Sequence, residues 1–203
     1  MKISLADLNE LKLAPVEYAK QQQETKYRRL SKNRYLKFAM YRFHKQKSLE
    51  SASEWLDKKI RQKFQSADDV EDFLASLKTY AESVEKLGNP TARYMDHLKI
   101  LLPPYYAQKF DITGEVPRLD VTPDGYAVWL IEKDPITVDD FRLPLIKGAY
   151  AIELQASLDE IEIGAYITSR GLHQTFDYST DAINGATDEL LGLLDAIIAS
   201  GIV

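Results

Sequence analysis

Asp120 and Glu132 are the residues whose type and spacing best suit chemistry in this sequence. They lie 12 positions apart in GEVPRLDVTPDGYAVWLIEKDP, residues 114–135, where a Pro-Asp-Gly turn separates two runs rich in β-branched and aromatic residues. Two strands paired across this turn place both carboxylates at one edge of a sheet. Carboxylates suit Mg²⁺ or Mn²⁺, which lowers the pKa of a bound water and neutralises phosphodiester charge. The alternative is a pair of solvent-exposed acids at strand ends.

Glu115 is a candidate third metal ligand on the same hairpin. It stands five positions before Asp120, and this odd spacing puts it on the other strand face unless Pro117 breaks the pleat.

A basic block covers residues 20–63, which hold 14 Lys/Arg and four Asp/Glu, whereas the remainder holds 12 and 27. A polyanion such as DNA is expected to dock there, because basic side chains pair with phosphates and aromatic rings stack on bases. A solvated helical surface with its aromatics in the core is the alternative. The candidate nucleic-acid-binding residues are Arg28, Arg29, Arg34, Lys37, Arg42 and Lys45.

Composition excludes several classes of site. The absence of cysteine excludes disulfides, thiolate zinc sites, an iron–sulfur cluster and a cysteine nucleophile. The three histidines are scattered, which argues against a histidine-rich metal site. No apolar run approaches the roughly 20 residues that span a bilayer, and Asp7 and Glu10 stand where a signal peptide would be apolar. We therefore expect no membrane association and a cytoplasmic location.

The periodicity predicts an α+β fold, α/β-like in its order, with a small mixed sheet flanked by helices. Residues 1–103 are predicted to be a long helical region, and residues 104–203 a sheet-containing core within one compact domain. The predicted helices cover residues 4–23, 31–46, 48–64, 66–88, 89–102 and 180–200, and residues 138–157 are predicted to be an entry loop followed by a helix. The predicted strands cover residues 105–113, 115–122, 126–133, 161–169 and 172–179.

The chain resembles RecB-like and RecE-like nucleases of the PD-(D/E)xK superfamily. Its opening segment is similar to theirs, the stretch 114–135 resembles their core hairpin with Asp120 as the first motif acid, and residues 141–158 resemble the following helix. The matching positions in the opening and in that helix are Ser4, Leu8, Ala14, Pro15, Tyr18, Tyr150, Gln155 and Ala156.

This resemblance implies a restriction-endonuclease-like core and a Mg²⁺- or Mn²⁺-dependent DNA nuclease of phage or bacterial recombination, repair or defence. Asp120 and Glu132 would hold the metal, Lys133 would orient the attacking water, and Gln155 would position the substrate. The second motif should read acid–x–Lys, yet Glu132 and Lys133 are adjacent, and Pro117 stands where many relatives have an acid. The alternative is therefore a catalytically inactive member that binds DNA, a protein partner or a second copy of itself.

Overall fold

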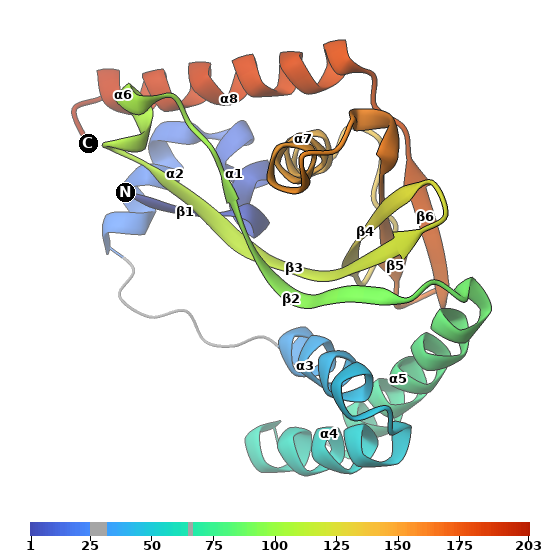
Figure 1. The fold of residues 1–203 in the computed structure, drawn as a ribbon. Coiled ribbons are helices and arrows are strands. Elements are labelled where there is room, and N and C mark those ends of the chain that lie inside the picture. Colours follow the sequence, from blue (N-terminus) through green and yellow to red (C-terminus); the bar gives the residue numbers. More distant parts are fainter. Residues whose placement is uncertain (25–31, 65–66) are drawn as a thin grey trace.

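The computed structural model describes residues 1–24, 32–64 and 67–203. A mixed six-stranded sheet lies between two helical layers, which confirms the predicted α+β class (Figure 1). The N-terminal elements are β1 (Lys2–Ser4), the 3₁₀ helix η1 (Leu5–Asp7), α1 (Leu8–Leu13), α2 (Pro15–Glu24), α3 (Lys32–Gln46), α4 (Leu49–Phe64) and α5 (Ala67–Leu87). They are followed by β2 (Thr91–Ile100), α6 (Pro104–Ala107), β3 (Asp111–Thr122), β4 (Gly125–Glu132), α7 (Arg142–Leu154), η2 (Leu158–Glu160), β5 (Ile161–Ile167), β6 (Leu172–Phe176) and α8 (Thr180–Ala199).

Two local predictions were wrong. The helix predicted over residues 89–102 is the strand β2, which pairs antiparallel with β3 from Thr91 to Ile100, so tertiary pairing overrides its local pattern. The strand predicted over residues 105–113 begins only at Asp111. Pro103 and Pro104 start the short helix α6 before it, because the fixed φ of proline suits the first helical position.

The strand β3 is the centre of the sheet, and one of its edges is divided. β2 pairs with β3 over positions 112–120. β1 and β4 each pair with positions that β2 also covers, so both must lie on the opposite edge. On that edge β1 is registered with 111–113 and β4 with 118–122. β4 leaves β3 beyond Trp129 but stays paired with β5 as far as Glu132, so the sheet opens between β1 and β4.

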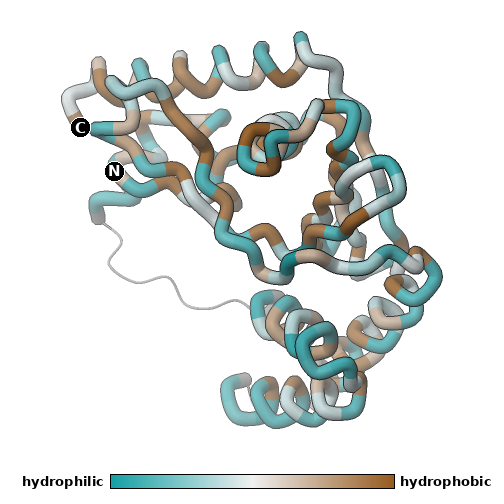
Figure 2. The backbone as a smooth tube through the Cα atoms, in the orientation of Figure 1, coloured by the Kyte–Doolittle hydropathy of each residue, from teal (hydrophilic) through white to brown (hydrophobic). Residues whose placement is uncertain are grey.

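Hydrophobic cores fill both faces of the sheet. Val128 and Leu130 of β4 pack on one face with residues of α1, α7 and α8. Ile131, one position further, packs on the other face with α3, α4 and α5, as the alternation of a strand requires. Figure 2 shows hydrophobic segments alternating with hydrophilic ones along α8, and hydrophobic segments along the strands of the sheet. None of the described helices is long and apolar enough to cross a membrane.

Candidate functional site: a charged cleft at the divided edge of the sheet

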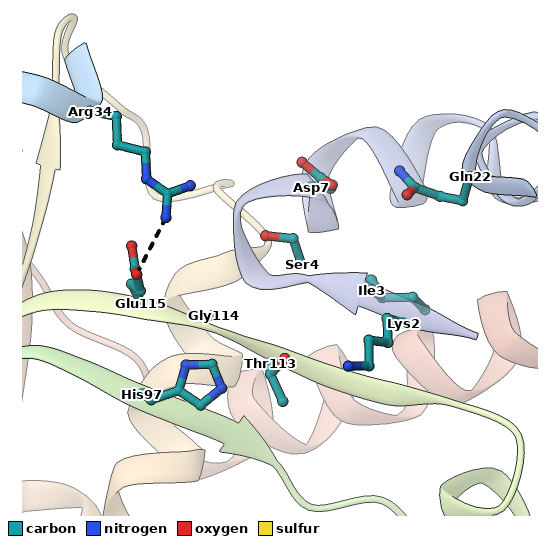
Figure 3. Close-up of a pocket in the computed structure, with 10 residues that line it drawn as sticks. All are labelled: Lys2, Ile3, Ser4, Asp7, Gln22, Arg34, His97, Thr113, Gly114 and Glu115. Atoms are coloured by element: carbon teal, nitrogen blue, oxygen red, sulfur yellow. Dashed lines mark hydrogen bonds and ion pairs between the residues drawn. The ribbon is translucent and has the colours of Figure 1, made fainter. Parts of the chain in front are cut away.

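A cleft of about 420 Å³ opens where β1 and β4 separate along β3. Its walls come from β1, η1, α2, α3, β2 and β3, and eight of its ten lining residues are polar (Figure 3). Pro117, which has no backbone N–H to donate, lies in the adjoining stretch of β3 that has no partner strand on the β1 and β4 side. The lining residues are Lys2, Ile3, Ser4, Asp7, Gln22, Arg34, His97, Thr113, Gly114 and Glu115.

Two residues singled out in the sequence, Arg34 and Glu115, line this cleft, and two more, Lys37 and Glu132, interact with them electrostatically. Arg34 reaches from α3 to Glu115 on β3, with 3.5 Å between Nη2 and Oε1 (Figure 3). Lys37, one turn further along α3, is half-buried, and desolvation lowers its pKa. The charge of Glu132 opposes this shift most strongly, followed by that of Glu115. Glu115, Glu132, Arg34 and Lys37 therefore form one cluster of carboxylates and cations.

Glu132 does not stand free in this cluster, because Arg142 at the start of α7 is bonded to it. The Arg142 Nη1 lies 2.9 Å from Glu132 Oε1, and its Nη2 lies 2.6 Å from Asp140 Oδ2. Asn9 of α1 donates to Asp140 Oδ1 at 3.1 Å. Burial opposes the Arg142 charge, but hydrogen bonds to Asp140 and the Glu132 charge outweigh it, and the pKa of Arg142 is raised. The carboxylate that was predicted to bind a metal thus binds a guanidinium.

Asp120 is fully buried in a separate polar network. Arg118 donates to it from Nε at 2.6 Å and again from Nη2. Trp129 Nε1 donates to Oδ2 at 3.1 Å, and the Thr91 hydroxyl donates to Oδ1 at 2.7 Å. These donors occupy both oxygens of Asp120, so this carboxylate does not fit a divalent ion as it is arranged.

Asp120 and Glu132 lie on opposite faces of the sheet. Arg118 is directly opposite Trp129, and directly paired residues share a face, as do Arg118 and Asp120 at a spacing of two. Glu132 is three positions from Trp129 and therefore points the other way, toward the side of Leu130. The structure does not bring together the two carboxylates that the hairpin pattern paired.

Lys133 and Gln155 are exposed and lie outside the cleft lining. Gln155 ends α7 in the left-handed conformation, with φ of 54°, and its backbone N–H bonds to Ile152. Tyr150, also on α7, is buried and donates its hydroxyl to Asp96 of β2 at 3.0 Å. The observed role of this helix is to join β2 to the rest of the core.

The basic residues divide between the cleft and the surface. Arg28 and Arg29 lie outside the described residues. Arg42 is half-buried, whereas Lys45 is exposed and stands 5.7 Å from the centre of the Tyr41 ring. On α4 the buried residues Ala52, Leu56 and Ile60 define the inner side. Apart from Arg34 at the cleft, the residues described as exposed and basic on α3, on α4 and in the turn between them are Lys45, Lys47, Lys58, Arg61 and Lys63; we call them the α3–α4 basic surface.

Sequence reasoning missed Asn9, Asp140 and Arg142. The stretch around Asp140 was interpreted as an entry loop, and no spacing pattern links position 9 with position 140. The only sequence feature that pointed to an ion pair there was the closeness of the charged residues Asp139, Asp140 and Arg142. Among the described residues no group of three His, Cys, Asp or Glu side chains is arranged to hold a metal ion.

No family model matches the chain, and a search of curated proteins found no match.

Proposed function

We propose that the protein binds nucleic acid without hydrolysing it, as an inactive member of the nuclease-like class that its sequence resembles. The observation that supports this most is that Asp120 and Glu132 are each bonded to an arginine. A carboxylate engaged in this way offers little negative charge to Mg²⁺. Catalysis by a metal-activated water requires that charge, because the ion must first be held.

The α3–α4 basic surface supports the binding half of the proposal. Residues 34–63 carry nine Lys/Arg and three Asp/Glu in a chain whose net charge is −5. Segregation of charge on this scale attracts a polyanion, and phosphate contacts of this kind read no base sequence. The cleft adds Arg34 of α3, Lys2 of β1 and His97 of β2. A phosphate backbone running along α3 and α4 would reach the mouth of this cleft.

Binding is tested by gel shift with labelled single-stranded and duplex DNA at increasing salt. We expect affinity to fall steeply with salt, because counterions are released, and to be the same with Mg²⁺ or EDTA. The variant Lys58→Glu/Arg61→Glu should bind more weakly and with a shallower salt dependence. The matched control Lys78→Glu/Lys86→Glu reverses two exposed lysines on α5 and should bind like the native protein. Equal losses in both variants would mean that net charge, not this surface, controls binding.

Metal-dependent hydrolysis is the second candidate, and one observation favours it. Lys37 is a partly desolvated lysine whose charge interacts with both Glu115 and Glu132. Two carboxylates and a lysine are what a metal-dependent nuclease needs. Incubating end-labelled DNA with Mn²⁺, Mg²⁺ or EDTA separates the two functions. Cutting that requires metal and is lost in Glu132→Gln would replace the binding proposal with the nuclease.

A further inference from the structure

Arg142 bridges two carboxylates that belong to different elements. Glu132 ends β4, Asp140 precedes α7, and one guanidinium bonds to both at 2.9 Å and 2.6 Å. A second bond, from Nε to Asp140 Oδ1, measures 2.9 Å. The three side chains are largely withdrawn from water, with exposures of 23% for Glu132, 6% for Asp140 and 13% for Arg142. The positive charge therefore sits in an enclosed position between two negative ones.

The Asp140 carboxylate and the Glu132 backbone have supports that do not depend on Arg142. Asn9 donates its amide to Asp140, and its carbonyl oxygen accepts from the backbone N–H of Phe141 at 3.0 Å. Glu132 is fixed by the pairing of β4 with β5, where it lies opposite Ile167 and accepts at its backbone oxygen from Thr168. The Asp140 carboxyl group and the backbone of Glu132 should therefore keep their places when the guanidinium is removed.

We infer that Glu132 and Asp140 form a cation site that the chain fills with its own guanidinium, and that Mn²⁺ or Mg²⁺ enters it when Arg142 is replaced. Glu132 and Asp140 are largely enclosed, and without Arg142 they lose the cation that pairs them, which is unfavourable; a divalent cation at the same place would neutralise both. Oxygen ligands suit these hard ions, and such ions usually keep several waters, which lets one carboxylate bind directly and the other through a water. This inference concerns metal binding alone and does not require that the protein binds nucleic acid.

The charged neighbours of this site set the expected selectivity. Lys37 and Arg34 lie on the α3 side, and Glu115 faces them from β3. These neighbours carry two positive charges and one negative charge, so removal of Arg142 leaves the whole cluster with an excess negative charge. Lys37 can compensate only one of the two carboxylates. A divalent ion that draws on both is therefore favoured over a monovalent one.

The test is Mn²⁺ binding by purified Arg142→Ala, followed by the loss of the free Mn²⁺ electron paramagnetic resonance signal and by thermal unfolding. We expect the variant to bind one Mn²⁺ at least about tenfold more tightly than the native protein, and its Tm to rise with Mn²⁺. Arg142→Lys keeps the positive charge and should not gain this site. Adding Asp140→Asn to Arg142→Ala should abolish the gain. Native protein that binds Mn²⁺ as tightly as Arg142→Ala would overturn the inference.

Arg93→Ala is the matched control. Arg93 also bridges two carboxylates, Asp96 and Glu153, but its side chain is 41% exposed. Glu153 is 38% exposed, and Asp96 keeps the hydrogen bond from Tyr150 when Arg93 is removed. No tight Mn²⁺ site should therefore appear, and an equal gain in this variant would show that any unpaired acid pair suffices. Should Arg142→Ala fail to fold alone, refolding is repeated with Mn²⁺, and with Na⁺ at equal ionic strength. Recovery only with Mn²⁺ supports the site, and no recovery with Mn²⁺ refutes it.

Discussion

Arg118 and Asp120 are two positions apart on one face of β3 and form an ion pair that is closed to solvent, with side-chain exposures of 1% and 0%. The network extends to Trp129 and Thr91. Beside it, Tyr80 of α5 donates to or accepts from His44 of α3, with 2.7 Å between the hydroxyl and Nε2. These polar groups lie between the sheet and the α3–α5 helices. Because their hydrogen bonds need specific partners, they favour one orientation of the helices on the sheet.

Asp120→Ala should be a stability variant. Removal of this carboxylate leaves the Arg118 charge buried and unpaired, which costs about 3–5 kcal/mol of unfolding free energy. Urea denaturation without any metal measures it. The control is Asp57→Ala, which breaks the exposed 2.8 Å pair with Arg61 and should cost less than about 1 kcal/mol. Equal stability of the two variants would contradict the structural role, and would return Asp120 to consideration as a functional acid.

Acid should destabilise the fold through His44 and His173. Burial, followed by the charge of Arg118, lowers the pKa of His44 to about 3 and that of His173 to about 4. Unfolded imidazoles bind protons below about pH 6.5, so stability is complete above that pH and falls as the pH drops toward 4. Each histidine contributes at most about 1.4 kcal/mol per pH unit.

Urea unfolding between pH 7 and pH 4.5 measures this dependence. The double variant His44→Phe/His173→Phe should show a shallower decline than the native protein. His97→Gln changes an exposed histidine of β2 and should follow the native curve. If the double variant keeps the native slope, other groups cause the acid sensitivity.

Lys37 should matter less for nucleic-acid binding than its charge suggests. Its half-buried ammonium lies among Glu115, Glu132 and their arginines, and desolvation is the largest influence on its pKa. Lys37→Met removes a desolvated charge while Arg34 and Arg142 continue to pair the acids, so unfolding free energy should change by less than about 1 kcal/mol. Gel shifts should give an affinity within about twofold of the native value. The exposed Lys45→Met should weaken binding more, and the reverse order would place Lys37 on the phosphate path.

Gly125 and Gly185 should respond oppositely to alanine. Gly125 closes the β3–β4 turn with φ of +145°, and an added Cβ would lie 2.2 Å from the backbone oxygen of Glu160. Gly125→Ala should therefore cost at least about 2 kcal/mol. Gly185 is inside α8 with nothing within 4 Å of the same position, so Gly185→Ala should add about 0.5–1 kcal/mol through helix propensity. Thermal unfolding of the two variants compares them, and a shared direction would contradict this account of the turn.

Much of the fold could be predicted from the sequence because its signals are local. The Pro-Asp-Gly turn marks the β3–β4 hairpin, and Gly88, with φ of 70°, ends α5 where the sequence indicates. β2 was mistaken for a helix because its strand character depends on β3, a partner with which it has no local sequence signal. The intrinsic propensity of a segment reflects its local sequence alone, whereas the formation of an edge strand depends on the strand with which it pairs.

The candidate site was harder to predict for the same reason. The hairpin pattern correctly placed Asp120 and Glu132 on paired strands, but it did not predict toward which face of the sheet each side chain points. Their faces follow from the register of Arg118 with Trp129, which is a property of the assembled sheet. Arg142 and Asn9 reach the site from helices far apart in the sequence, and no one-dimensional spacing relates them.

The position of β1 beside β3 implies an order in which the elements fold during synthesis. Lys2 pairs with Asp111, and the Met1 amino group donates to the Lys109 carbonyl, 108 positions away. The α3–α5 helices pack on one another locally, and their residues leave the ribosome before β3 exists, so we expect them to collapse first. The cleft, whose walls need both β1 and β3, then closes later. A nascent chain is thus expected to form its basic helices before the sheet on which they pack.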